Sequence, residues 1–168
     1  TKLTTLINWF DQDAQDPGGL TRAKAFSDPQ SVESAAINAN TSVSRRHAQV
    51  GFNLSHSFDA NNAVTLMTYV GNRENSQILP INAAGTNART SEISRDFYGS
   101  DLRWDNNGDV FGKVYNISVG LNHGKSVDKR LDTNTQLAGV PANALNRDED
   151  NISSNFDQYI QGELSILD

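Results

Sequence analysis

The sequence lacks cysteine, long apolar runs and any excess of basic residues. The absence of cysteine excludes disulfide bonds, thiolate metal sites and a cysteine nucleophile. The longest apolar run is Ala35-Ala36-Ile37, far shorter than the roughly 20 residues that a transmembrane helix needs. With 14 Lys and Arg against 20 Asp and Glu, the net charge is -6, which argues against a nucleic-acid partner.

The other general features set looser limits. The 168 residues suffice for about one domain with a hydrophobic core. The apolar fraction of 36% is low, yet the net charge is too small for a disordered chain. No charged-then-apolar leader begins the chain, so a signal peptide is expected to be absent or already removed. A membrane strand stays compatible with this composition, because it needs only about 10 residues of alternating polarity.

Apolar residues recur at every second position in several stretches, the pattern of strands with one apolar face. The polar positions between them form the opposite face. With two weaker stretches included, the alternation predicts six strands, at Leu3–Phe10, Ala48–Phe58, Asn62–Val70, Arg95–Trp104, Tyr115–Asn122 and Tyr159–Ile166.

The connections between these strands alternate in length. Asp59–Asn62 and Asp105–Asp109 are rich in Asn, Asp and Gly, which predicts tight turns. The other connections are long: Asp11–Val43, Pro80–Ile93 and Leu131–Asp150. Short turns on one side and long loops on the other are typical of transmembrane β-barrels.

Two further signals complete the predicted fold. Phe58, Trp104 and Phe111 flank the short turns, as aromatic residues do at a membrane interface. Asp28 as N-cap and Pro29 as first residue predict one short helix in the first long loop, continuing through Ala36. The expected fold is therefore all-β: an antiparallel up-and-down meander of about six strands, part of a transmembrane β-barrel.

No catalytic or metal-binding pattern stands out. His47, His56 and His123 lack the spacing of a metal site. Asp105–Asp109 resembles the start of a calcium loop, but Asn116 occupies the position where glutamate is required, so a hairpin turn is expected there. We therefore expect no enzymatic activity, no metal and no cofactor.

The polar strand faces leave two interpretations open. In a soluble β-sandwich they would face bulk water, and in a large barrel they would line a hydrated lumen. The alternating connection lengths favour the barrel. The residues concerned are Asp101, Arg103, Asn116, Asn122, Asp157, Gln161 and Glu163.

Several short segments resemble TonB-dependent outer-membrane receptors, most closely those of the siderophore or ferric-citrate type. They occur in order along nearly the whole chain: Gln15–Arg22, Asp28-Pro29, Asn38–Thr41, Gln49–Gly51, Asp96–Gly99, Arg147–Asp150 and Asn155–Tyr159. The resemblance implies a 22-stranded barrel in the bacterial outer membrane, closed by an N-terminal plug domain. It also implies import of a scarce nutrient, usually a ferric chelate, driven through TonB.

The chain departs from a full member of that family. It has no plug domain, no TonB box and about six strands, and it ends in Ile166-Leu167-Asp168 without a terminal aromatic residue. Residues 1–168 are therefore expected to form one internal segment of the barrel, in contact with lipid and with the plug of the parent receptor. Such a segment would not transport by itself, and its open edges and apolar face would make it self-associate or rearrange.

Arginines in the loops and upper lumen are the expected ligand residues, because a ferric chelate or other nutrient anion needs cationic partners. Arg73, Arg89 and Arg95 are the candidates. Two alternatives stay open. One is a soluble β-sandwich binding module of the carbohydrate-binding or adhesin type, with shorter strands and no alternation of loop lengths. The other is a complete small outer-membrane barrel or barrel enzyme, for which eight strands would fit the length.

Overall fold

A computed structural model describes residues 1–136 and 144–166 of the chain. Six strands form one antiparallel sheet in which strand order equals chain order. This confirms the all-β meander expected from the sequence. The strands are β1 (Lys2–Gln15), β2 (Ser42–Ser57), β3 (Asn62–Pro80), β4 (Asn87–Val110), β5 (Lys113–Gln136) and β6 (Ala144–Leu164).

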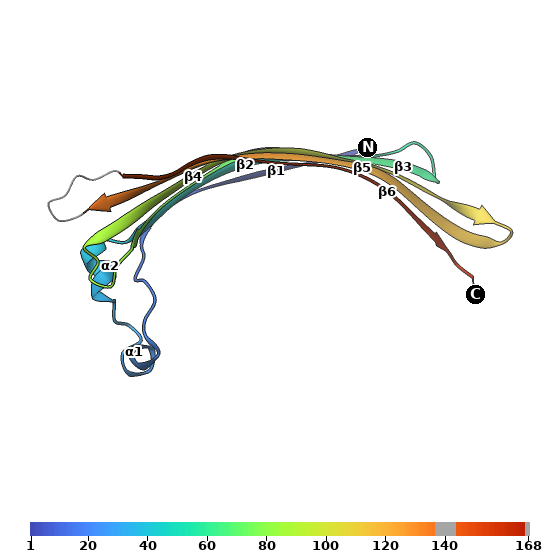
Figure 1. The fold of residues 1–168 in the computed structure, drawn as a ribbon. Helices are drawn as coiled ribbons and strands as arrows, with labels where there is room; N and C mark the ends of the chain where they lie inside the picture. Colours follow the sequence, from blue (N-terminus) through green and yellow to red (C-terminus); the bar gives the residue numbers. More distant parts are fainter. Residues whose placement is uncertain (137–143, 167–168) are drawn as a thin grey trace.

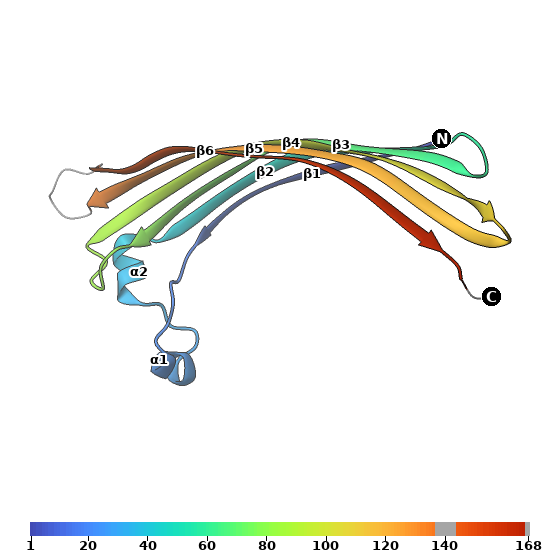
Figure 2. The same cartoon turned by 45° about the vertical axis from the view of Figure 1, so that its right-hand side comes forward.

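The sheet is an open arch and does not close into a barrel (Figures 1 and 2). Two short helices, α1 (Arg22–Ser27) and α2 (Ser34–Ala39), lie between β1 and β2 on the concave side of the arch. We call the end of the sheet that carries them the helix end, and the opposite end, with residues 58–61 and 111–112, the turn end. Among the described residues, no helix is long and apolar enough to cross a membrane.

The strand register assigns every second residue to one face. Gln77 of β3 donates from Nε2 to Oδ2 of Asp16 at 3.1 Å, and Asp16 opens the segment that carries the two helices. Because that segment lies on the concave side, Gln77 and the residues in register with it mark the concave face. Their strand neighbours on either side belong to the convex face.

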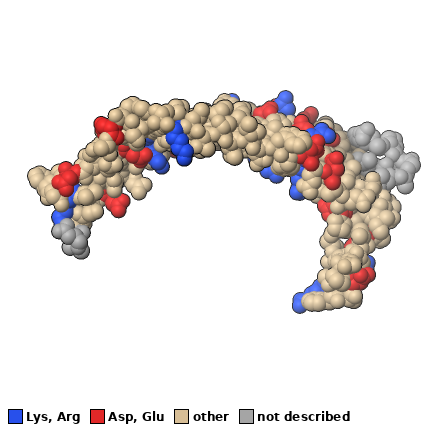
Figure 3. Space-filling model, turned by 180° about the vertical axis from the view of Figure 1, so that it is seen from behind, with Lys and Arg blue, Asp and Glu red and all other residues tan. Residues whose placement is uncertain are grey.

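The convex face carries an apolar belt across the sheet, interrupted by polar residues such as Asp96, Lys125 and Gln158. Cross-strand neighbours such as Leu54, Leu66, Leu102 and Leu121 lie side by side in it. In Figure 3 the crest of the arch is mostly free of charged side chains. The apolar belt comprises Leu3, Ile7, Trp9, Ala48, Val50, Phe52, Leu54, Val64, Leu66, Val70, Tyr98, Leu102, Trp104, Ile117, Val119, Leu121, Phe156 and Ile160.

The second predicted turn is wrong in position. Asp105–Asp109 belongs to β4, and the chain reverses at Phe111 and Gly112, whose φ angles are 55° and 74°. Positive φ at both central residues is the requirement of a type I′ hairpin turn. Within the strand, side-chain hydrogen bonds satisfy the polar residues: Tyr115 Oη donates to Asn106, and Ser118 Oγ donates to Asp105 at 2.6 Å.

The strands are also longer than their alternation predicts. β4 and β5 each span 24 residues, well beyond the roughly 10 that cross a bilayer. The expected long loop Pro80–Ile93 therefore shrinks to residues 81–86, because β4 begins at Asn87. Most of Leu131–Asp150 is likewise strand, while its residues 137–143 lie outside the described residues, as do the terminal residues 167–168.

The helix prediction needs correction in number and position. Two helices form instead of one, and Asp28 is the C-cap of α1 rather than an N-cap. The N-cap of α1 is Thr21, whose side chain accepts from the Lys24 backbone N–H. Helix α2 begins only at Ser34. The backbone N–H of Asp28 bonds to the Lys24 carbonyl, so this residue is committed to ending α1.

The few well-buried apolar residues gather where α2 meets the hairpin formed by β3 and β4. Ala36, Ala39 and Ala88 are buried there. Asn38 donates from Nδ2 to the Ala84 carbonyl at 2.8 Å, and a Cβ at Gly85 would lie 2.7 Å from Ala35 Cα. The absence of a side chain at Gly85 lets the hairpin and the helix touch. Helix α2 is therefore fixed to the sheet.

Candidate functional site

Six arginines gather on the concave face at the helix end. Register places them on the same face of five adjacent strands, β2 to β6, over several neighbouring rows, and the strands carry three carboxylates among them: Asp128, Asp132 and Glu149. We call these arginines the arginine cluster. It consists of Arg45, Arg73, Arg89, Arg95, Arg130 and Arg147.

Arg73 and Arg95 lie directly opposite each other on β3 and β4. Arg95 binds Asp128 with both ends of its guanidinium group, Nε to Oδ1 at 2.6 Å and Nη2 to Oδ2 at 2.5 Å. Arg73 is exposed, and its side chain makes no hydrogen bond or ion pair with the described part of the chain. Arg73 is therefore a cation whose charge is available to a ligand.

Arg89 lies on β4 six residues from Arg95, nearer the helix end. The Asn146 side-chain oxygen accepts from its Nε and Nη2 at 3.2 and 3.1 Å, in the amide orientation that satisfies both groups. Asn146 occupies the irregularity where β5 and β6 shift register beside Asp132 and Thr133. A bulge re-aims side chains locally, and here it brings an uncharged amide onto Arg89 without neutralising it.

Asp132 on β5 is the most deeply buried charged residue described, at 1% exposure. Arg130 donates from Nε to Oδ1 at 3.2 Å and from Nη2 to Oδ2 at 3.1 Å, and Ser91 Oγ donates to Oδ1 at 2.7 Å. Arg147 Nε lies 3.9 Å from Oδ2. The hydrogen bonds from Arg130 lower the pKa of the Asp132 carboxyl; burial opposes the shift, and Ser91 and Arg147 reinforce it. The carboxylate thus stays ionised.

Aromatic rings and glycines occupy the concave face beside the arginines and in the next rows toward the turn end: Phe10 and His47 share the row of Arg73, and Phe97 and Gly71 form the next one. His47 stacks between Phe10 and Phe97, with ring centroids 5.5 and 5.9 Å apart. Phe97 lies flat against the sheet over Gly71, where a Cβ would also lie 2.8 Å from the Ala48 carbonyl oxygen. The glycine permits this close packing. The wall is therefore smooth and uncharged beside the arginine cluster.

The structure brings two of the sequence-predicted ligand residues together, Arg73 and Arg95, and places Arg89 six residues further along β4 on the same face; half of the cluster was missed. Arg73, Arg89 and Arg95 share the concave face of β3 and β4. Arg130 and Arg147 are missed because no strand is predicted between Asn122 and Tyr159: Arg147 falls in the expected loop Leu131–Asp150, and Arg130 lies just before it. Extending β5 from Leu121 at period two puts Arg130 and Asp132 among its even positions, which lie opposite Ile93 and Ser91 of β4.

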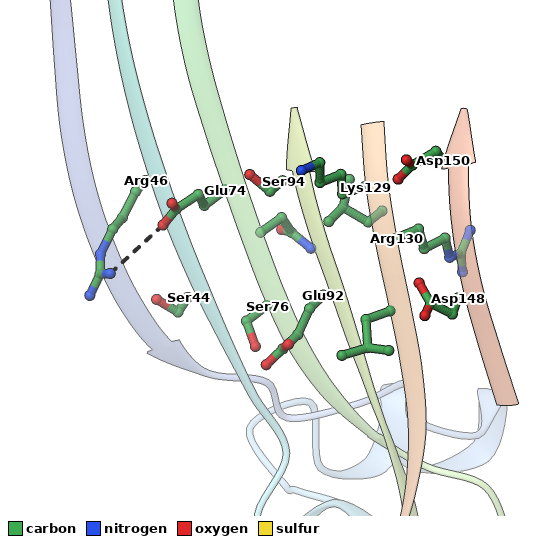
Figure 4. A pocket seen from close by; sticks show the side chains of 13 residues that line it. Ser44, Arg46, Glu74, Ser76, Glu92, Ser94, Lys129, Arg130, Asp148 and Asp150 are labelled. Atoms are coloured by element: carbon green, nitrogen blue, oxygen red, sulfur yellow. Dashed lines mark ion pairs between the residues drawn. The ribbon is translucent and has the colours of Figure 1, made fainter. Parts of the chain in front are cut away.

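The convex face at the helix end, on the opposite side of the sheet from the arginine cluster, differs from the concave face in its charged residues. A hollow of about 480 Å³ lies just above the apolar belt, lined by Ser, Glu, Lys and Asp residues of β2 to β6. Arg46 there pairs with Glu74 at 3.8 Å (Figure 4), and it also lies 3.5 Å from Asp11. Arg130 also lines this hollow, whereas Arg73, Arg89 and Arg95 do not. Its acidic residues make it a poorer anion site than the concave face.

No metal centre is evident in the described residues. His, Cys, Asp and Glu side chains nowhere gather there in a group of three or more that would hold a metal ion. His47 is engaged in the aromatic stack, and His123 Nδ1 lies 3.0 Å from the Asn155 carbonyl oxygen. The chemistry of the cluster is thus that of guanidinium groups, which recognise carboxylate and phosphate oxygens in bidentate fashion.

Comparison with known proteins supports the fold. No protein-family model matches the chain. Among solved structures, the chain is similar to the ferric citrate transporter FecA in its unliganded crystal form, with a TM-score of 0.80 at 15% sequence identity. The match covers 98% of this chain and 24% of FecA, so the chain spans about a quarter of that protein's length. The resemblance to ferric-citrate-type receptors expected from the sequence is thereby confirmed as a likeness of fold.

Proposed function

We propose that the chain is a wall segment of a TonB-dependent outer-membrane receptor that takes up a ferric chelate or similar scarce nutrient. One observation carries the proposal: a sheet with the fold of part of a ferric citrate transporter has an apolar convex face and a polar concave face rich in arginine. An apolar face toward lipid and a polar face toward a lumen are what a membrane barrel requires.

The proposal assigns partners and limits to the segment. Bacterial outer-membrane lipid covers the apolar belt, and the plug domain of the parent receptor, through which TonB acts, occupies the concave side. The role is binding and transport rather than catalysis. A six-stranded open sheet encloses no channel, so the segment does not transport alone.

The membrane orientation can be tested with adjacent residues of β3. Leu66 and Met67 are 38% and 39% exposed but belong to opposite faces. In the parent receptor in lipid vesicles, a spin label on Leu66→Cys is expected to relax with lipid-soluble oxygen. A label on Met67→Cys should be shielded from it. A label on Leu66→Cys that is shielded from both oxygen and a water-soluble nickel chelate would instead support the soluble β-sandwich alternative, in which the apolar face is buried.

Ligand binding is tested by neutralising the three sequence-predicted arginines in the parent receptor. Arg73→Gln is expected to weaken the binding of an anionic ferric chelate most, by about tenfold, because this guanidinium has no internal partner among the described residues. Arg89→Gln and Arg95→Gln should weaken it less. Arg46→Gln on the convex face is the matched control and should leave the dissociation constant unchanged. Unchanged affinity in all three concave variants would refute the assignment.

The isolated chain offers a third test. β1 and β6 have no outer strand partner among the described residues, and large apolar side chains of the belt are exposed. Open strand edges and apolar faces drive association. In buffer without detergent, light scattering should detect oligomers or aggregates, and added detergent should reduce their size. A stable monomer with the same strand register would contradict the lipid-facing assignment.

A further inference from the structure

Asp132 and its arginines differ sharply in exposure. The Asp132 side chain is 2% exposed, whereas those of Arg130 and Arg147 are 33% and 43% exposed. The negative charge is covered by the two guanidinium groups that it binds. A ligand approaching the concave face therefore meets cations first, with the compensating carboxylate behind them.

The contacts leave part of each guanidinium group unused. Arg130 directs Nε and Nη2 to Asp132, and Arg147 directs Nε toward Asp132 and, at 3.3 Å, toward Oε1 of Glu149. The Nη1 group of Arg130 makes no contact with the described residues. A guanidinium held along one edge keeps its other N–H groups for a second anion, with little side-chain freedom left to lose.

The carboxylate itself is held in place from the other side. Ser91 Oγ donates to Oδ1 at 2.7 Å from β4, and the register shift beside Asp132 places Arg147 of β6 within reach. Three strands thus converge on one carboxylate. An ordinary surface ion pair, exposed and joined through two flexible side chains, has no such framework.

We infer that Asp132 is a positioning residue of the ligand site, a buried carboxylate that fixes the guanidinium groups of Arg130 and Arg147 toward the lumen for an anionic ligand. The inference rests on the proposed function. It adds two ligand-contacting arginines, Arg130 and Arg147, to the three predicted from the sequence. Asp132 itself touches no ligand.

The direction in which Asp132→Asn changes ligand affinity distinguishes a positioning role from an effect of overall charge. Asp132→Asn removes a negative charge from the concave face, so simple electrostatics predicts tighter binding of an anion. Positioning predicts the reverse, about tenfold weaker binding, because Arg130 loses the carboxylate that accepts both of its hydrogen bonds and Arg147 keeps only Glu149 as a partner. A purely structural role predicts lower thermal stability with an unchanged dissociation constant. Asp150→Asn, at a similar height on the convex face, is the matched control and should change nothing.

The experiment uses the parent receptor in detergent and three probes: ferric citrate, a ferric tris-catecholate and a ferric tris-hydroxamate. Failure of the unaltered receptor to bind any of them overturns the proposed function itself. If one binds, its dissociation constant is measured for Asp132→Asn, for Arg130→Gln/Arg147→Gln and for the triple variant. We expect the first two to weaken binding and the triple variant to match the double.

Non-additivity is the specific signature of one residue acting through others. Equal or tighter binding by folded Asp132→Asn overturns the inference, as does a further loss of affinity when Asp132→Asn is added to the double variant. If Asp132→Asn does not fold, the double variant decides alone. Its arginines are partly exposed, so folding should survive, and wild-type affinity there would refute the inference.

Discussion

The two faces of the sheet at the helix end carry opposite charge on the same strands. On the concave face the strands carry six arginines against three carboxylates, and Asp16 adds a fourth carboxylate through its bond to Gln77. The convex face, over the rows next to the apolar belt, has six carboxylates against Arg46 and Lys129: Asp11, Asp13, Glu74, Glu92, Asp148 and Asp150. Because successive residues point to opposite faces, a strand can hold both charges without pairing them. Composition averaged over the chain, at a net charge of -6, conceals this division.

The largest expected effect comes from placing a charge on the wrong face. Leu121 and Asn122 are neighbours in β5, and only Leu121 belongs to the apolar belt. Leu121→Arg should lower the free energy of unfolding in a bilayer by about 2–4 kcal/mol, because the charge enters lipid. Asn122→Arg should lower it by less than about 1 kcal/mol, since the concave face is hydrated. Denaturant unfolding from lipid vesicles measures both, and equal losses would erase the distinction between the faces.

A steric change gives the next largest effect. Gly71 lies under Phe97 on the concave face, whereas a Cβ added at Gly162 in β6 would meet no atom within 4 Å. Gly71→Ala should cost about 1–3 kcal/mol, because the new methyl group meets both a ring and a backbone carbonyl. Gly162→Ala should cost less than about 0.5 kcal/mol by the same unfolding measurement. A small loss at Gly71 would show that Phe97 moves aside freely.

Acid should weaken the concave face through Asp132. Its pKa is lowered below the usual 3.8 on folding, so the folded state holds this proton less tightly than the unfolded state. The carboxylate therefore contributes stability above about pH 4 that is lost as the pH falls through the folded-state pKa. Unfolding measured between pH 5 and pH 2 should show a shallower loss for Asp132→Asn than for the unaltered protein. The convex variant Asp150→Asn should keep the original slope.

The smallest effect is expected from the convex ion pairs. Arg46 is 61% exposed and lies 3.5 and 3.8 Å from its two carboxylate partners. Exposed pairs contribute at most about 1 kcal/mol and are screened by salt. Arg46→Gln should therefore change the free energy of unfolding by less than about 1 kcal/mol, and less at high salt. A loss well above that would mean that the convex hollow is more rigid than its exposure indicates.

How far the sequence predicts this structure depends on the contrast between the two faces. Where one face is apolar, as at Val119 and Leu121, alternation locates the strand. Where both faces are polar, as from Asp128 to Asp132, period two carries no signal and the pattern resembles a loop. The same loss of contrast makes Asp105–Asp109 resemble a turn. Of the true turn, only Gly112 offers a local signature, since Phe111 is an unusual residue at positive φ.

The sequential order of the strands determines how the sheet tolerates insertions and deletions. Each strand takes its register only from its chain neighbours, and the two short turns set that register. Removing a single residue from 58–61 would invert the parity of β3 relative to β2. Every residue beyond it would then move to the opposite face of the sheet, unless a compensating bulge restored the count. We therefore expect this protein to tolerate insertions and deletions of two residues better than those of one residue.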